Sequence, residues 1–222
     1  KSILEADTMS QLEDIYRPFK EKKQTRATVA IALGLTPLAN ILSSARLNTV
    51  EFQKEAKKFV SSKVTSIEEA IKGAQDILAE RYAENPRERE AIRNSMLRFG
   101  NLEVKKTKTF DEKGLYKNLV GKGEKVAFIP SHRYLAVMRG VSQKELSVKI
   151  TIDMQRVEDN IKSYKIPSHA SSSKELLLAA YLDGLKRLLL PSIEREVQSL
   201  LKEKADLSAI RVFGKNLGQL LM

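Results

Sequence analysis

The sequence contains no cysteine, which excludes a disulfide framework and any zinc site built on thiolates. It has only two histidines, so a metal site would have to be rich in carboxylates. Glycine and proline are scarce, with 10 and 6 in 222 residues, which argues against a loop-rich all-β fold or a disordered chain. The lack of cysteine fits a reducing compartment, and we expect a cytoplasmic protein.

Long apolar runs are missing as well. The run LLLAAYL at 176–182 is far shorter than the roughly 20 residues that a membrane helix needs. The chain does not open with a basic segment followed by an apolar one, so nothing indicates secretion. We therefore expect no membrane partner.

Positive charge is in excess and is unevenly placed. Lysine and arginine outnumber aspartate and glutamate by 39 to 28, and residues 101–150 alone hold 11 basic and 5 acidic side chains. This balance favours a polyanionic partner, with nucleic acid ahead of an anionic membrane. A generally basic protein without such a partner is the alternative, because charge also sets solubility.

Helical patterns and helix-start signals dominate the chain, which predicts a mainly α fold, a multi-helix scaffold. The clearest starts are a capping box at Ser66 and Glu69 and an Asn-Pro pair at 85–86. Toward the end we expect long helices with a kink or break at Pro191, since proline removes a backbone hydrogen bond. The expected helices span 25–34, 36–44, 49–60, 66–82, 85–100, 174–190, about 191–204 and about 206–221.

One small β element is expected near 145–153, where apolar and polar residues alternate. Its partner is either 136–140, in a hairpin, or a strand outside this chain. The preceding segment, 101–125, is basic and punctuated by glycine, with one short helix expected near 111–119. These changes along the chain divide it into an N-terminal helical region at 1–100, a basic segment at 101–153 and long helices at 154–222.

The segment PSHRYLAVMRG (130–140) combines a serine, a histidine and an arginine. Adjacent side chains on a helix diverge, so Ser131 and His132 cannot form a nucleophile pair locally. We predict a helix that starts near Ser131 and ends at Gly140, with first-turn side chains that fix its junction to the next strand and stabilise the fold. An exposed nucleic-acid contact or catalysis are the alternatives for His132. The residues assigned to this structural junction are Ser131, His132, Arg133, Arg139 and Gly140.

No catalytic or metal-binding motif occurs in the sequence, neither HExxH nor a calcium loop, a P-loop or GxGxxG. Acidic residues that stand close together, such as Glu194 with Glu196 or Asp111 with Glu112, are expected on solvated surface, because such spacings point to different helix faces. We predict no enzyme activity, no catalytic residue, no cofactor, no metal and no small-molecule substrate.

The segment YRPFKEKKQTRAT (16–28) is the best candidate for a binding site. It holds five cations and a single acid, beside Tyr16 and Phe19, and its proline and polar run predict a loop from which long side chains reach phosphates. A solvated loop whose cations pair with acids elsewhere in the protein is the alternative. The candidate nucleic-acid contacts are Arg17, Lys20, Lys22, Lys23 and Arg26.

Several stretches stand in order across 4–221: LEDIYRPFKEKKQTRATVA, GLTPLA, GAQDILAE, IPSHRYLAVMRG, DGLKRLLLPSIEREVQSLLKEKA and AIRVFGKNLGQLL. Together they resemble Tex, the bacterial transcription accessory family. The resemblance implies a helical scaffold followed by a ribonuclease-H-like module, helix-hairpin-helix motifs and an S1 RNA-binding domain. It also implies that this chain is a fragment, which lacks a stretch before Lys1 and stops just before the ribonuclease-H-like module.

Charge and resemblance together predict a non-catalytic scaffold that adds a basic surface for RNA or DNA, without sequence preference, and positions RNA-binding modules. Contact with the transcription machinery would fit the same role. A protein–protein module that never touches nucleic acid is the main alternative, and part of a nuclease or hydrolase is the other.

Overall fold

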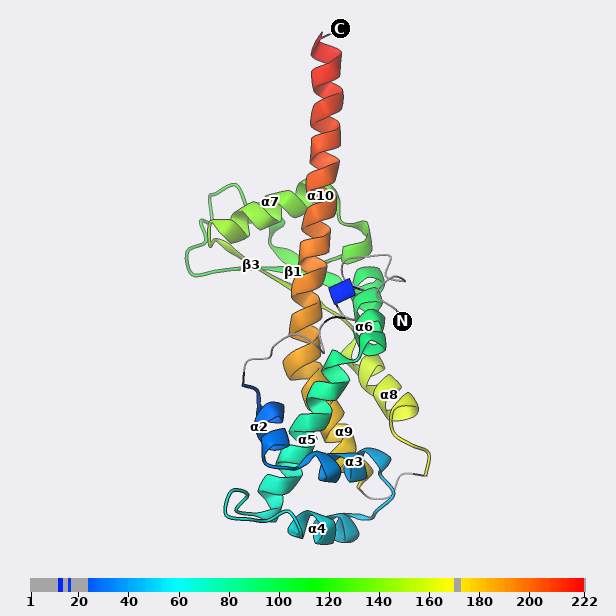
Figure 1. Cartoon of the computed structure of the whole chain (residues 1–222). Helices are drawn as coiled ribbons and strands as arrows, with labels where there is room; N and C mark the ends of the chain where they lie inside the picture. Colours follow the sequence, from blue (N-terminus) through cyan, green and yellow to red (C-terminus); the bar gives the residue numbers. More distant parts are fainter. Residues whose placement is uncertain (1–11, 14–15, 17–23, 170–172, 222) are drawn as a thin grey trace. The chain divides into compact units, whose positions relative to one another are not determined.

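A computed structural model describes residues 12–13, 16, 24–169 and 173–221, the side chain of residue 122 excepted (Figure 1). The prediction of a mainly α fold with one small β element is confirmed. The described α-helices are α2 (Arg26–Ala32), α3 (Thr36–Ser44), α4 (Thr49–Lys57), α5 (Ile67–Glu84), α6 (Pro86–Phe99), α7 (Ser131–Ser142), α8 (Met154–Tyr164), α9 (Lys174–Asp183) and α10 (Leu190–Leu221).

Contacts divide the chain into two compact units, each built from two separate pieces of sequence. The first unit joins the residues up to Glu90 with Met154–Pro191, and the second joins Ala91–Asp153 with the residues from Ser192 onward. The expected division followed three consecutive segments. The units differ from it because distant parts of the chain pack together, which pattern along the sequence does not reveal.

The helix starts follow local polar chemistry. Thr25 and Asn48 each accept a hydrogen bond from the amide three residues on, and the side chain at that position bonds back to the cap amide. Ser66 accepts from the Glu69 amide at 3.1 Å, as predicted. The Glu69 carboxylate differs from the prediction, since it accepts from the amide of Thr65 rather than from that of Ser66.

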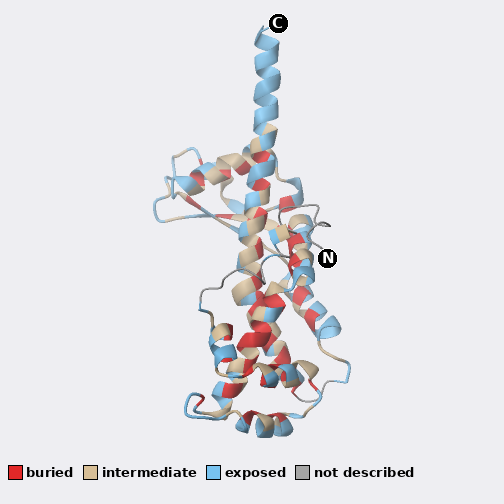
Figure 2. Ribbon diagram, viewed as in Figure 1, coloured by how far each residue is buried: buried red, intermediate tan, exposed pale blue. Residues whose placement is uncertain are grey.

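Helix α5 is the centre of the first unit and carries many of its buried residues (Figure 2). Small side chains such as Ala70 and Ala74 let α2, α3 and α9 approach it closely. Gly73 is needed for the same reason, because a Cβ there would lie 2.3 Å from Cδ1 of Leu35. The core of this unit also includes Leu38, Leu42, Phe52, Ile77, Leu177 and Ala180.

Of the kink or break predicted at Pro191, the break does not occur, because the chain stays helical through this segment. A π-helical stretch, η5 (Gly184–Leu189), follows α9, and α10 then begins at Leu190. The backbone keeps right-handed helical angles at Asp183, Gly184 and Leu190, so Pro191 follows helical residues directly and comes just after the π-helical stretch. The break expected between the last two helices, near 205, is also absent, since α10 runs through it.

The second unit contains a three-stranded antiparallel sheet in the order β2-β1-β3. The strands are β1 (Asn101–Lys106), β2 (Gly121–Lys125) and β3 (Leu146–Thr151), so the predicted strand is confirmed. Both expectations for its partner are wrong, because β3 pairs with β1 and residues 136–140 belong to α7. The helix expected near 111–119 is only a 3₁₀ turn, η3 (Lys117–Leu119). Strand β1 escaped prediction because only two apolar residues, Leu102 and Val104, alternate in it.

No single helix among the described residues is long and apolar enough to cross a membrane. Helices α2 and α3 reach that composition only as a pair, and the chain bends by 110° between them. Their apolar residues, among them Ala27, Ala30, Leu38 and Leu42, are buried in the core of the first unit.

Candidate nucleic-acid interface

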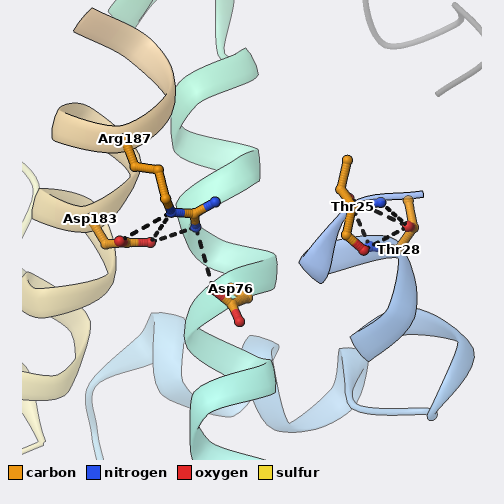
Figure 3. Close-up of polar contacts among 5 residues, drawn as sticks. All are labelled: Thr25, Thr28, Asp76, Asp183 and Arg187. Atoms are coloured by element: carbon orange, nitrogen blue, oxygen red, sulfur yellow. Dashed lines mark hydrogen bonds and ion pairs between the residues drawn. The ribbon is translucent and has the colours of Figure 1, made fainter. Parts of the chain in front are cut away.

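Only one of the five predicted loop contacts falls in the described part of the chain. Arg26 is the first residue of α2 and is exposed. It lies between Thr25 and Thr28, the two residues that form the capping box of this helix (Figure 3). Arg17, Lys20, Lys22 and Lys23 lie outside the described residues.

Arg26 lies near a cluster of charges formed by η5, α9 and α5. Arg187 donates from Nη2 to Asp183 at 2.6 Å and contacts Asp76 at 3.3 Å (Figure 3). The hydrogen bond from Arg187 lowers the pKa of the Asp183 carboxyl, and the charges of Lys72 and Arg26 act in the same direction. Because Asp183 and Asp76 hold Arg187, its charge stabilises the first unit rather than being free for a ligand.

The predicted junction residues occupy the first turn and the end of α7. Ser131 is the first helical residue, but the cap position is Pro130 and no side chain caps the helix. Arg133 forms an ion pair through Nε with Glu124 of β2, which ties the helix to the sheet. His132 is exposed and has no hydrogen bond or ion pair within the described ranges, so the contacts at this junction lie on its neighbours.

The other end of α7 corrects a second expectation. The helix continues past Gly140 to Ser142, so this glycine does not end it. Gly140 is buried, and a Cβ there would lie 2.6 Å from Cδ1 of Leu146 and 3.2 Å from the ring of Tyr116. The glycine is needed for close packing of α7 on β3. Arg139, next to it, is exposed.

Tyr134 is an anchor of this helix that the sequence analysis missed. Its side chain is buried, and its hydroxyl donates to the carbonyl oxygen of Gln198 in α10 at 2.8 Å. Burial raises the pKa of the Tyr134 phenol to about 12. The sequence could have indicated this contact, because Tyr134 is three residues before Val137 and so lies on the same apolar face of the helix.

The expectation that the glutamates of α10 are solvated is wrong. They point to different sides, as their spacing predicts, and each has its own partner. Glu194 accepts from the backbone amide of Ile150 at 2.7 Å, and Glu196 pairs with the buried Arg93 at 2.6 Å. Of the other pair, Glu112 is exposed and forms an ion pair with Lys106. No group of three or more histidine, aspartate or glutamate side chains in the described ranges is arranged to hold a metal ion.

One face of the sheet carries only polar side chains, and we call it the open face. Leu102 and Val104 of β1 lie opposite Ile150 and Val148 of β3, on the face that is packed into the core. Because side chains alternate along a strand, their neighbours in sequence point the other way. Pairing and alternation assign to the open face Asn101, Glu103, Lys105, Lys125, Ser147, Lys149 and Thr151.

Positive charge exceeds negative charge on the open face. Glu103 lies 3.5 Å from Nζ of Lys105, directly opposite Lys149, and accepts a hydrogen bond from Thr151 at 3.2 Å. Lys125 and Lys149 are exposed and have no ion pair within the described residues. The open face thus carries three lysines, Lys105, Lys125 and Lys149, and a single carboxylate, that of Glu103.

A shallow groove borders the open face beside Gly123 of β2. From the open face it is lined by Asn101, Glu103, Lys105, Gly123 and Thr151, and its other lining residues are Val104, Lys106, Val120 and Gly121. Gly123 is required there, because a Cβ would lie 2.7 Å from that of Asn101. Gly121 has a φ of +156° and open space around it.

Further cations extend this surface beyond the strands. Thr107 and Thr109 donate to the carbonyl oxygen of Lys144, which ties the loop after β1 to the turn before β3. The cations on these segments are exposed and have no ion pair in the part of the chain that the structure describes: Lys108, Lys113, Lys117 and Lys144. The surplus seen in residues 101–150 is therefore largely uncompensated within the second unit.

These features define a mainly helical protein with a small, basic sheet in its second unit. The family described as Tex central region-like matches residues 48–213. The chain belongs to this family.

Relatives match along nearly the whole chain. It is 34% identical to the protein YdcI of Bacillus subtilis over 100% of its own length and 31% of that relative. It is 30% identical to the transcriptional accessory protein Tex of Neisseria gonorrhoeae, over 98% of the chain and 29% of the relative. The human S1 RNA-binding domain-containing protein 1 is 28% identical over 100% of the chain and 24% of the relative. The chain thus spans less than a third of the length of these relatives.

Proposed function

We propose that this chain is a non-catalytic helical scaffold of a cytoplasmic transcription accessory protein. In this role it holds RNA-binding modules of the full-length protein in position and adds a basic surface that contacts nucleic acid without sequence preference. Membership of the Tex central region-like family and the name of the relative from Neisseria gonorrhoeae support the transcription role, and the name of the human relative supports contact with RNA.

The observation that carries the nucleic-acid contact is the uncompensated charge of the second unit. Lys125 and Lys149 on the open face, and Lys108, Lys113 and Lys117 on the loop after β1, are exposed without an ion pair in the described residues. Surface lysines of this kind neutralise phosphates and release bound counterions. By contrast, Arg187 in the first unit is already held by two aspartates.

Titration with nucleic acid at several salt concentrations tests this proposal. We expect the chain to bind single strands and duplexes of unrelated sequence, with affinity that falls steeply as salt rises. Each phosphate contact adds about 0.7 to the slope of log K against log salt for a single strand and about 0.9 for a duplex. Binding that is absent, or independent of salt, would contradict the proposal and favour a module that contacts proteins alone.

Two further measurements separate the remaining alternatives. Replacing Lys20, Lys22 and Lys23 together by glutamine should lower the salt slope by up to about three contacts if the predicted loop takes part. Incubating the chain with labelled DNA and RNA in the presence of Mg²⁺ or Mn²⁺ should leave both substrates intact. Metal-dependent cleavage by the pure protein would instead support a nuclease.

A further inference from the structure

We propose that the open face of the sheet is a track for the sugar–phosphate backbone of a single, unpaired strand, with its bases left unread. This inference rests on the proposed function and names the site and the form of nucleic acid that it binds. It is carried by the glycine-floored groove, the lysines along it and the absence of aromatic side chains from the open face.

The lysines are spaced to follow one strand. Lys105 and Lys149 are diagonal neighbours on β1 and β3, because Lys149 lies opposite Glu103. Such a diagonal places their Cα atoms about 7–8 Å apart. Lys125 stands at the other end of the face, opposite Asn101. A nucleic-acid strand that lies along β1 therefore meets a lysine at each end of the open face.

The groove admits one strand and excludes a duplex. Its hollow lies beside Gly123, which has no side chain on β2, while Glu103 and Lys105 stand on the neighbouring strand. Neighbouring strands are only about 4.8 Å apart, so the space left by one missing side chain is narrow. Glycine in a strand also lets another backbone approach closely. A double helix is too broad to enter and can touch only the lysines at the rim.

The chemistry of the open face favours phosphates over bases. Proteins that grip the bases of single strands stack them on aromatic rings. The open face offers only Asn101, Glu103, Thr151, Ser147 and lysines. Without a stacking platform, affinity comes from charge and from hydrogen bonds to phosphate oxygens, so base composition should matter little.

Replacing Glu103 should raise the affinity for nucleic acid, whereas replacing the lysines should lower it. Its carboxylate is the single negative charge on the open face and stands between Lys105 and Lys149. A phosphate on the track is repelled by it. Replacing Glu103 by glutamine removes this repulsion and keeps an acceptor for Thr151.

The test uses fluorescence anisotropy of the whole chain with labelled oligo-dT, oligo-rU, a mixed single strand and a mixed duplex. The track variant carries Lys105→Gln, Lys125→Gln and Lys149→Gln. A charge-matched control carries Lys54→Gln, Lys57→Gln and Lys63→Gln, three exposed lysines of the first unit. Circular dichroism and urea unfolding establish that every variant keeps its fold.

At about 0.1 M salt we expect the track variant to bind all three single strands about 100-fold more weakly, with a slope reduced by about 2. The control variant should lose far less affinity for the same single strands. Glu103→Gln should bind single strands about fivefold more tightly, a gain that misfolding cannot produce. The duplex should lose less affinity than the single strands in the track variant.

The outcomes separate the two proposals. Salt-dependent binding that is equal in the track variant and the control would overturn the track and leave the proposed function standing. A duplex that loses as much as the single strands, or a Glu103→Gln variant that binds no more tightly, would also overturn it. If the unmodified chain binds no nucleic acid at any salt concentration, the nucleic-acid contact of the proposed function fails first.

Discussion

Glu194 of α10 accepts a hydrogen bond from the backbone amide of Ile150 in β3, at 2.7 Å. Strand β3 is an edge of the sheet, and this amide points away from β1 because Ile150 occupies a non-hydrogen-bonded pair with Leu102. An edge amide without a partner would offer a site for pairing with another chain. The glutamate closes part of this edge and fixes α10 to the sheet.

Glu194→Ala should destabilise the second unit by about 1–3 kcal/mol, because the amide of Ile150 loses a charged acceptor in a partly buried place. Glu194→Gln keeps an acceptor and should cost less. Urea unfolding followed by circular dichroism measures both. Glu203→Ala, at an exposed position of the same helix, is the control and should change stability little. Equal stability of Glu194→Ala and this control would mean that the hydrogen bond does not hold the sheet edge.

Tyr134, and not His132, makes the stabilising contact that the sequence predicted for this helix. His132→Ala should leave the free energy of unfolding nearly unchanged, since the side chain is exposed and lacks a hydrogen bond in the described ranges. Tyr134→Phe removes the donor to the Gln198 carbonyl and should cost about 1 kcal/mol. Thermal melts measure both variants: Tyr134→Phe should melt at a lower temperature than His132→Ala, and the reverse would show that His132 is the anchor.

Helix starts were predictable because their chemistry is local. Ser66, Pro86 and Pro37 mark helices that the structure contains within a few residues. The sheet was predicted only in part, since β1 and β2 bury few side chains and are strands only through pairing, β1 with β3 and β2 with β1. Nothing within such a short segment distinguishes it from a basic loop.

The candidate site was harder to predict than the fold, because it depends on which residues a strand register brings together. The excess charge of 101–150 was visible in the sequence, but the neighbours Lys149 and Glu103 are 46 residues apart and meet only through the pairing of β1 with β3. Similarly, the sequence predicts a surface position for Glu196, whereas the fold pairs it with the buried Arg93. The requirement for Gly123 also follows only from the close approach of Asn101.

Acid should weaken the first unit through Asp183. The hydrogen bond from Arg187 lowers the pKa of this carboxyl in the folded state, so the ion pair stabilises the fold above the ordinary carboxyl pKa and is lost as the pH falls through the lowered value. We expect Asp183→Asn to cost about 1 kcal/mol at pH 7, a modest value because each side chain is about a third exposed. The difference from the unmodified chain should shrink below about pH 4, as urea unfolding at a series of pH values would show. A difference that stays constant down to pH 3 would assign the loss to packing.

Two glycines in the C-terminal helices should respond to alanine in opposite ways. Gly184 begins the π-helical stretch, and a Cβ there would lie 2.4 Å from the carbonyl oxygen of Ala79, an atom of the α5 backbone that cannot move aside alone. Gly184→Ala should therefore destabilise the first unit by about 1–3 kcal/mol or more, as overpacking does. Gly214 lies on the exposed end of α10 with nothing within 4 Å of its Cβ position, so Gly214→Ala should favour the helix by about 1 kcal/mol.

Urea unfolding and the helical signal in circular dichroism test this pair directly, and the shared substitution removes any effect of alanine itself. The contrast arises because α5 and η5 pack with their backbones in near contact, whereas the last turns of α10 are exposed in the part of the chain that the structure describes (Figure 2). Gly184→Ala that is as stable as the unmodified chain would show that η5 does not press against Ala79. Gly214→Ala that loses helicity would show that the end of α10 is not helical in solution.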